Sequence, residues 1–334
     1  MAMGRDARIE VGATVLFFAV AVAAAVLLWE HGRYTEDGPL AQDTSVVIPK
    51  DTGVAGIAGL LLTRGVISDR RLFMAGAWAF GLDRKLRAGE FAFPAGISMQ
   101  VVTRLLVSGQ VVKRRFTVAE GLTTSQVLAK IVAAEGLSGP LPTGYFSEGE
   151  FLPETYFYSY GDSRTQLVQR MRKTMNEVLD ESWFRRSRDL GLSTRREALT
   201  LASRIEKETA RAGERTRISA VFHNRLRRSM RLQSDPTVVY GLTEGAGFLT
   251  RPLTRRDLAH PSPYNTYRKS GLPPGPIANP GRAAIEAALN PASTDELYFV
   301  ADGKGGHLFA KTLAAHNRNV AKWRRLKRGR AGGG

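Results

Sequence analysis

Two glutamates, Glu206 and Glu208, stand in a Glu-Lys-Glu run with helical apolar spacing, and they are the first candidates for chemistry. On a helical wheel of ~100° per residue, Glu206 falls inside an apolar arc with Leu201 and Ile205, while Glu208 falls just outside it. A carboxyl group held against apolar surface has a raised pKa, because desolvation disfavours its charged form. A general acid near neutral pH needs this property, so Glu206 is the candidate acid.

The same pattern is typical of a structural glutamate paired with arginine or histidine, and spacing alone does not separate the two roles. Ser203, Arg204 and Lys207 are expected on the side of the helix away from the apolar arc. Glu208 is expected to be solvated, most simply in an exposed ion pair, and a role in supporting the site stays open.

Segments downstream are rich in side chains that suit sugar recognition. Ser262–Tyr267 and Gly271–Gly281 combine tyrosine and asparagine with glycine and proline, which predicts rigid polar-aromatic loops. Flat aromatic faces pack against sugar rings, and amides bind hydroxyl and acetamido groups. A structural turn with core tyrosines is the alternative. Asp235 and Pro236 are typical of an N-cap and first helical residue, so Asp235 has capping as its simplest role.

Metal and nucleophile motifs are missing from the sequence. None of its 5 histidines belongs to a His-Glu-x-x-His pair, and it has 0 cysteines. The chain also lacks a Gly-x-Ser-x-Gly elbow and a phosphate-binding Gly-Lys-Ser/Thr loop. We therefore expect no metal and no cofactor, and histidines that lie on the surface or in the core.

The elements that must position these residues begin with an apolar run. Val11–Trp29 contains no charge and, as a helix rising ~1.5 Å per residue, nearly spans a ~30 Å hydrocarbon layer. It is expected to be one transmembrane helix, with a cleaved signal peptide as the alternative. Arg5 and Arg8 precede the run and only Arg33 follows closely, which places residues 1–10 in the cytoplasm and the later domains outside.

After this anchor we expect an α+β chain in which short strands, turn glycines and amphipathic helices alternate. Residues 46–93 read as strand, helix, helix, strand, with one helix capped by Ser68, an order similar to the small glycan-binding LysM module. Longer helices are expected from Ser163 to Leu190 and from Thr194 to Arg211. The expected divisions are a linker at 30–45, a LysM-like subdomain at 46–115, a mixed α/β catalytic domain at 116–328 and a flexible tail at 329–334.

Several long motifs now carry a resemblance to a known family. They are LASRIEKETARAGER, VFHNRLRRSMRLQSDPTVVYG, SPYNTYRKSGLPPGPIANPG, ALNPA and LYFVADGKGGHLFAKTLAAHN. In this order the chain resembles the membrane-anchored endolytic murein transglycosylases, the MltG or YceG-like family. The dense similarity covers about residues 199–323, and the anchor, the LysM-like segment and FLPETYF are similar with less specificity.

The resemblance implies that Glu206 is the catalytic acid and protonates the β-1,4 oxygen between N-acetylmuramic acid and N-acetylglucosamine. The muramic 6-hydroxyl then attacks its own anomeric carbon and leaves a 1,6-anhydro end without consuming water. Glu206, once ionised, would take the hydroxyl proton. An internal nucleophile fits the lack of an obvious second catalytic carboxylate.

The resemblance also implies a set of residues that line the substrate cleft. They are Gln233, Ser234, Asp235, Tyr264, Asn265, Thr266, Tyr267 and Asn279. The implied partners are peptidoglycan glycan strands, the membrane and the peptidoglycan synthases (penicillin-binding proteins). The implied location is the cytoplasmic membrane, crossed once, with the catalytic domain on the periplasmic or extracytoplasmic side, where cleavage of nascent strands ends their growth.

Three other functions compete with this interpretation. A hydrolytic muramidase would use Glu206 with a second carboxylate such as Asp235 to activate water. A non-catalytic peptidoglycan-binding scaffold would keep the LysM-like segment and tolerate loss of Glu206. Nucleic-acid binding is suggested by the net charge of +17, yet the basic residues are dispersed and accompany no recognition motif. Attraction to anionic lipid or to carboxylates of wall peptides is a simpler use of that charge.

Overall fold

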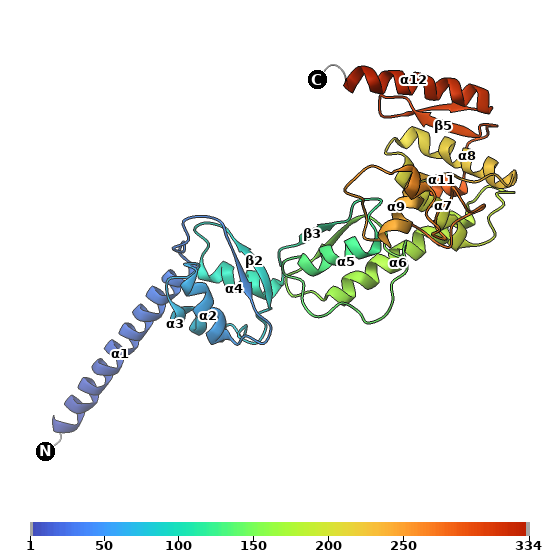
Figure 1. The fold of residues 1–334 in the computed structure, drawn as a ribbon. Coiled ribbons are helices and arrows are strands. Elements are labelled where there is room, and N and C mark those ends of the chain that lie inside the picture. The colour runs from blue at the N-terminus through green and yellow to red at the C-terminus, as the bar shows by residue number, and fades with distance from the viewer. Residues whose placement is uncertain (1–2, 332–334) are drawn as a thin grey trace. The chain divides into compact units, whose positions relative to one another are not determined.

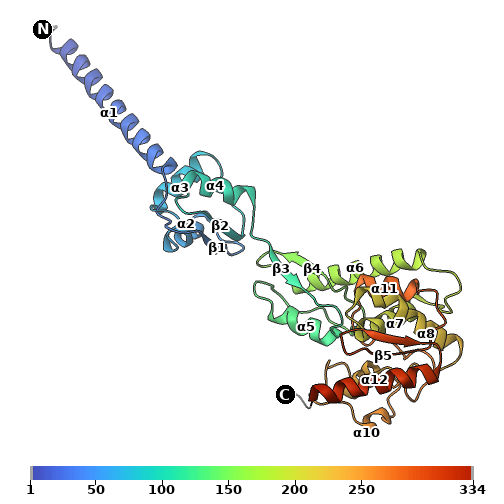
Figure 2. The same cartoon turned by 90° about the horizontal axis from the view of Figure 1, so that it is seen from above.

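The computed structural model describes residues 3–331, and the side chains of residues 10–328. The chain divides into two compact units, shown in Figures 1 and 2. The first unit runs up to Arg114 and includes the short segment Ser159–Gly161, and the second holds Arg115–Tyr158 and the chain from Asp162 onward. Together the helices and strands confirm the expected α+β class.

The first helix, α1 (Met3–Thr35), projects from its unit as a single long element (Figure 1). The most apolar 18 residues of its segment Glu10–Thr35 have a mean hydropathy of 2.7, and this segment is the one helix among the described residues long and apolar enough to cross a membrane. The helix continues past Trp29 into the segment expected to be a linker. Tyr34, near its end, is buried in the first unit, and its hydroxyl oxygen lies 2.8 Å from Thr103 Oγ1. The start of the expected linker is therefore helix docked on the core.

The rest of the first unit has the expected order of strand, helix, helix and strand. Two antiparallel strands pair with Thr44 opposite Phe93 and Ile48 opposite Gly89. Asp69, not Ser68, caps the second helix, because its carboxylate accepts hydrogen bonds from the amides of Arg71 and Leu72. The likeness to a LysM module stays a prediction. The elements are β1 (Thr44–Ile48), α2 (Val54–Thr63), α3 (Arg70–Ala79), β2 (Gly89–Phe93) and α4 (Met99–Ser108).

The second unit contains two hydrophobic cores. One lies between the two-stranded sheet β3–β4, α5 and the first half of α6, and is built on buried side chains such as Phe151 and Met171. The other lies among the later half of α6, α7, α8 and α11. The elements are β3 (Arg114–Thr117), α5 (Thr124–Ala133), β4 (Thr155–Tyr158), α6 (Arg164–Phe184), α7 (Arg195–Glu208), α8 (Arg215–Arg227) and α11 (Arg282–Leu289).

Short elements and a C-terminal layer complete this unit. The antiparallel strands β5 and β6 form a hairpin, and α12 packs against both of them, as Figures 1 and 2 show for β5. The elements are η1 (Ala212–Glu214), α9 (Asp235–Thr243), α10 (Arg255–Leu258), β5 (Tyr298–Ala301), β6 (His307–Ala310) and α12 (Leu313–Ala331).

Several predicted boundaries differ from the structure. Helix α6 ends at Phe184 instead of Leu190, and α7 ends at Glu208 instead of Arg211, because Thr209 has an extended backbone with φ −146°. The expected flexible tail begins inside α12, which continues to Ala331, and residues 332–334 lie outside the described residues.

Candidate active site

Helix α7 lies at the centre of the second unit and carries both glutamates. Thr194 and Glu197 form a capping box at its start, which fixes where the helix begins. Every residue from Ala198 to Ile205 is buried, because α6, α8 and α11 all pack on this helix. The expectation that Ser203 and Arg204 point outward is therefore wrong. A helix surrounded by protein has no solvent face for a wheel to identify.

Glu206 lies in a closed ion-pair network. Its side chain is 5% exposed, its Oε2 accepts a hydrogen bond from the Gly281 amide at 2.9 Å, and Arg215 lies 3.5 Å from its Oε1. The same guanidinium pairs with Glu120 at 3.2 Å. Burial raises the pKa of Glu206 and the charge of Glu120 adds to this, while Gly281 and Arg215 oppose it. The bond to the Gly281 amide links α7 to the start of α11.

Glu208, in contrast, faces a cleft of about 510 Å³. Ser234 donates its hydroxyl proton to Glu208 Oε1 at 2.5 Å. Among the described residues Glu208 has no ion-pair partner within 4.0 Å, so the expected exposed ion pair is wrong. The cleft is lined by Glu208, Arg225, Gln233, Asp235, Tyr267, Phe299, Val300, Ala301, His307, His316, Val320, Trp323 and Arg324.

The surroundings of Glu208 favour its protonated form. Burial is the main reason that its pKa is raised, and the nearby negative charge of Asp235 adds to the effect. The Ser234 hydrogen bond and the positive charges of Arg204 and His307 act in the opposite direction. A carboxylic acid in this position can give up a proton inside a cleft, which is the property first sought at Glu206.

Helix α9 begins at this cleft. Ser234 occupies the N-cap position but makes no capping bond, because its hydroxyl binds Glu208. Asp235 is the first helical residue, so its expected role as the cap is wrong. Its Oδ1 accepts a hydrogen bond from the Tyr267 hydroxyl at 2.6 Å. Gln233, exposed and in a left-handed conformation with φ 50°, completes the cleft edge. Four of the predicted substrate-binding residues thus meet beside Glu208.

The two predicted asparagines lie elsewhere and serve the fold. Asn279 is fully buried, and its amide accepts from the Phe151 N–H at 2.9 Å and donates to the Leu122 carbonyl at 3.0 Å. Asn265 is equally buried and donates to the carbonyls of Leu258 and His260. Because these amides are satisfied by backbone groups, neither asparagine lines the cleft.

Thr266 and Tyr264 are also absent from the cleft lining. Thr266 is buried, and its hydroxyl accepts from the Ser234 N–H at 3.0 Å, which holds Ser234 in place. Tyr264 packs its ring 4.7 Å from that of Tyr240, next to Glu148. Glu148 accepts from the Thr124 amide at 2.9 Å, and burial raises its pKa to about 7. This second unusual carboxyl stands among tyrosines.

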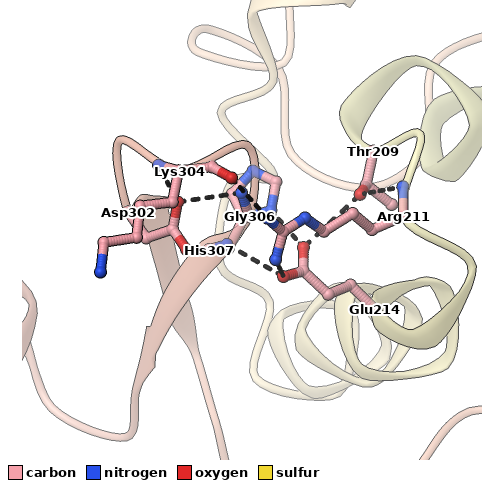
Figure 3. A network of polar contacts seen from close by, with 7 residues as sticks. All are labelled: Thr209, Arg211, Glu214, Asp302, Lys304, Gly306 and His307. Atoms are coloured by element: carbon pink, nitrogen blue, oxygen red, sulfur yellow. Dashed lines mark hydrogen bonds and ion pairs between the residues drawn. The ribbon is translucent and has the colours of Figure 1, made fainter.

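His307 was missed by sequence reasoning, which treated every histidine as surface or core. Its Nδ1 lies 2.7 Å from Glu214 Oε2, and its amide donates to the other Glu214 oxygen at 3.1 Å (Figure 3). Arg211 binds the Lys304 carbonyl in the same network. The turn before His307 is closed by Asp302, which accepts from two turn amides, so the histidine is held rigidly beside the cleft. Its signal in the sequence was the Gly-Gly-His run after a hairpin turn.

Arg225 and the residues of α12 were missed as well. Arg225 is 8% exposed and donates to the carbonyls of Leu232 and Leu297, so its donors stabilise the cleft floor. His316 stacks on Tyr298 with ring centroids 5.1 Å apart.

Among the described residues, no group of three or more His, Cys, Asp or Glu side chains could share a metal ion.

Comparisons with known proteins agree on one family. Residues 46–322 match the model of the YceG-like family. A Bacillus subtilis protein named endolytic murein transglycosylase is 31% identical over 321 residues, which cover 84% of this chain and 84% of that protein. A Streptococcus pneumoniae protein of the same name is 36% identical over 181 residues, 53% of this chain and 32% of that protein.

A solved structure shows the same fold. The crystal structure of a YceG-like protein from Listeria monocytogenes aligns with a TM-score of 0.53 and 29% identity. The alignment covers 83% of this chain and 98% of that one.

Proposed function

The chain belongs to the YceG-like family, and from that premise we propose that it is an endolytic murein transglycosylase whose active site is the cleft at Glu208. The names of its relatives support the activity. The observation that carries the location is the hydrogen bond from Ser234 to Glu208 inside a cleft that also holds Gln233, Asp235 and Tyr267.

We place the general acid at Glu208 instead of Glu206. Both carboxyls have a raised pKa, so the pKa does not separate them. Their partners do: Glu206 is tied to the Gly281 amide and Arg215, whereas Glu208 lines a cleft wide enough for sugar. A catalytic acid must reach the atom that it protonates, and the cleft lined by Glu208 has room for that atom.

In the proposed reaction Glu208 acts first as the acid and then as the base. Its proton passes to the oxygen of the β-1,4 bond between N-acetylmuramic acid and N-acetylglucosamine as the bond to the anomeric carbon breaks. The muramic 6-hydroxyl attacks that carbon, and its proton returns to the Glu208 carboxylate. The ends formed are a 1,6-anhydro sugar and a free 4-hydroxyl, and no water is used. General acid catalysis of this kind contributes ~10²–10⁴-fold to the rate.

A hydrolytic muramidase is the second candidate, because one feature of the cleft favours it. Asp235 is exposed in the same cleft, and its charge acts on Glu208. A second carboxylate of this kind activates water in inverting glycosidases. The product then carries a reducing end instead of an anhydro end.

The location we propose is the cytoplasmic membrane. Helix α1 is long and apolar enough to cross it once, and the two arginines before its apolar stretch favour a cytoplasmic N-terminus. The catalytic unit then acts on the periplasmic or extracytoplasmic side, on nascent glycan strands near the peptidoglycan synthases. Cleavage there ends strand growth.

Mass spectrometry of glycan products tests the proposal. The full chain in detergent is incubated with polymeric, uncrosslinked peptidoglycan beside its Glu208→Gln variant. Internal fragments with anhydro-muramic ends, present with the wild type and absent with the variant, are expected. Reducing ends would identify a muramidase and direct attention to Asp235. Intact strands with the wild type would contradict both enzymatic proposals.

A further inference from the structure

One wall of the cleft takes no part in the proposed reaction. Helix α12 contributes His316, Val320, Trp323 and Arg324 to the lining. The first three are spaced by four and then three residues, which places them on one face of a helix. This face packs over β5 and β6, as Figure 1 shows for β5. Helix α12 is thus a wall of the site and not only a basic tail.

Helix α12 is strongly positive. The sequence of α12 contains seven basic residues, Arg318, Lys322, Arg324, Arg325, Lys327, Arg328 and Arg330, and no acidic residue. Of these, Arg324 alone lines the cleft. Within residues 10–328, whose side chains the structure describes, Arg324 is exposed and makes no hydrogen bond or ion pair. The other arginine of the cleft, Arg225, is buried and committed to backbone carbonyls.

Trp323 completes the feature. It is half-buried in the cleft lining, beside Arg324, and Lys327 Nζ lies 5.4 Å from its ring centroid. An unpaired guanidinium beside an aromatic ring is suited to a ligand with a carboxylate next to apolar or amide groups. Arg324 and Trp323 thus line the same cavity as Glu208, from the α12 wall.

We propose that Arg324 binds a carboxylate of the peptide carried by muramic acid, so that the enzyme recognises peptide-bearing strands. This inference rests on the proposed function. The two sugars at the cleaved bond carry no charge once the lactyl group is joined to a peptide, whereas the peptide has free carboxylates. The Arg324 guanidinium therefore binds the peptide part of the substrate, and other groups of the cleft bind the sugars.

Anionic lipid is the competing ligand of a basic helix. Arg325 and Arg328 belong to the same helix but do not line the cleft, so a lipid surface would engage them as well as Arg324. The seat of Arg324 inside the cavity with Glu208 favours the substrate peptide.

Two substrates separate these possibilities. One is uncrosslinked peptidoglycan with intact peptides. The other is the same material after an amidase has hydrolysed the bond between the lactyl group and the peptide, which removes the peptide and frees the lactyl carboxylate. The full chain in detergent is assayed with both, as wild type, Arg324→Ala, Arg324→Lys and the matched control Arg325→Ala.

We expect Arg324→Ala to lower kcat/KM for peptide-bearing strands by roughly three- to tenfold, through a higher KM, as loss of one charged hydrogen bond implies. Its activity on stripped strands should stay within about twofold of wild type. Arg324→Lys should recover part of the loss, and Arg325→Ala should behave as wild type. Equal losses on both substrates, or no loss on either, would overturn the proposal.

Vesicle binding supplies the remaining distinction. If Arg324→Ala and Arg325→Ala both reduce binding to phosphatidylglycerol vesicles and neither changes cleavage, α12 binds lipid and the peptide subsite is rejected. If the wild type cleaves neither substrate, the transglycosylase proposal itself has failed, which differs from a selective defect in Arg324→Ala.

Discussion

The hydroxyl of Ser234 donates a hydrogen bond to the carboxyl group of Glu208 across 2.5 Å, and this bond joins the end of α7 to the start of α9. It also leaves α9 without a side-chain cap. A capping bond contributes roughly 1 kcal/mol, so the chain forgoes that stability to orient one carboxyl. The loss of a stabilising local interaction, here the helix cap, is typical of a functional site.

The two glutamates of α7 should respond differently to the same change. Glu208→Gln removes the proposed proton donor and should lower turnover by ~10²–10⁴-fold with little change in Tm. Glu206→Gln breaks the contact with Arg215 in a nearly buried network, and should lower the free energy of unfolding by about 1–3 kcal/mol while keeping most activity. Glycan cleavage and thermal unfolding are measured on both. Full activity in Glu208→Gln with loss in Glu206→Gln would return the acid to Glu206.

Ser234→Ala should change the pH profile. The hydroxyl favours the charged form of Glu208, so its loss raises the pKa of that carboxyl further. Because the protonated form is the active acid, the alkaline limb of kcat should move to higher pH. The lost hydrogen bond should also lower kcat by roughly fivefold, equivalent to about 1 kcal/mol. Ser229→Ala, at a surface turn, is the control. An alkaline limb that stays in place would show that Glu208 is not the titrating acid.

Asn279→Ala should act on stability and not on substrate affinity. The buried amide accepts a hydrogen bond from the Phe151 N–H, which loses its partner in the variant. The Leu122 carbonyl loses the bond from the side-chain amide and keeps the bond from the Asn279 backbone N–H. The free energy of unfolding should fall by about 2–4 kcal/mol, measured by denaturant titration. At a temperature where the variant is folded, its KM should match that of the wild type. A raised KM with normal stability would place Asn279 in the substrate site after all.

Glu148 should make the fold less stable as the pH rises. Burial raises the pKa of Glu148 from its usual 4.5 to about 7. A raised carboxyl pKa leaves stability intact below pH 4.5 and removes it progressively as the pH rises to about 7. Glu148→Gln should therefore be more stable than wild type at pH 8, by about 1–3 kcal/mol, and match it at pH 4. Thermal unfolding across this range is the measurement, and parallel curves for the two proteins would contradict it.

Buried Arg204 should lower the free energy of unfolding and lower the pKa of Glu208. Its guanidinium is fully buried 4.4 Å from the Phe222 ring, makes no hydrogen bond with any described residue, and has its pKa lowered to about 10 by burial. Arg204→Met should raise the free energy of unfolding by about 1–3 kcal/mol. Because the positive charge lowers the pKa of Glu208, its removal should shift the alkaline limb of activity upward. A less stable variant would show that the guanidinium contributes more than its burial costs.

Local patterns were enough to predict much of the fold. The uncharged run that ends at Trp29, the turn glycines and the amphipathic spacings predicted the apolar helix and the strand-helix-helix-strand order. The family follows from long motifs in order, and the comparisons confirm it. Three of the proposed substrate-binding residues, Gln233, Asp235 and Tyr267, line the cleft with Glu208, and Ser234 is hydrogen-bonded to Glu208; their role in binding substrate stays a prediction.

The direction of individual side chains was harder to predict. A helical wheel assumes that one face of the helix is exposed to solvent, but α7 is surrounded by protein. The wheel therefore predicted that Arg204 and Glu208 are solvated, whereas Arg204 is fully buried and Glu208 lines a cleft. The amides of Asn265 and Asn279 have the same chemistry toward a sugar as toward a backbone carbonyl, and only the folded loops show which partner they have. The position of His307 is fixed by its contact with Glu214, which lies 93 residues away in the sequence, so local patterns do not predict it.

The burial of Tyr34 has a mechanical meaning. Its ring packs directly on Gly76, where a Cβ atom would lie 2.3 Å from it, and its hydroxyl meets Thr103. If α1 spans the bilayer as proposed, these contacts fix the first unit to the end of that helix, and the unit lies next to the lipid surface. The depth of the helix in the membrane then sets the distance of this unit from the bilayer. Shortening or lengthening the apolar run would change that distance without altering any residue of the proposed active site.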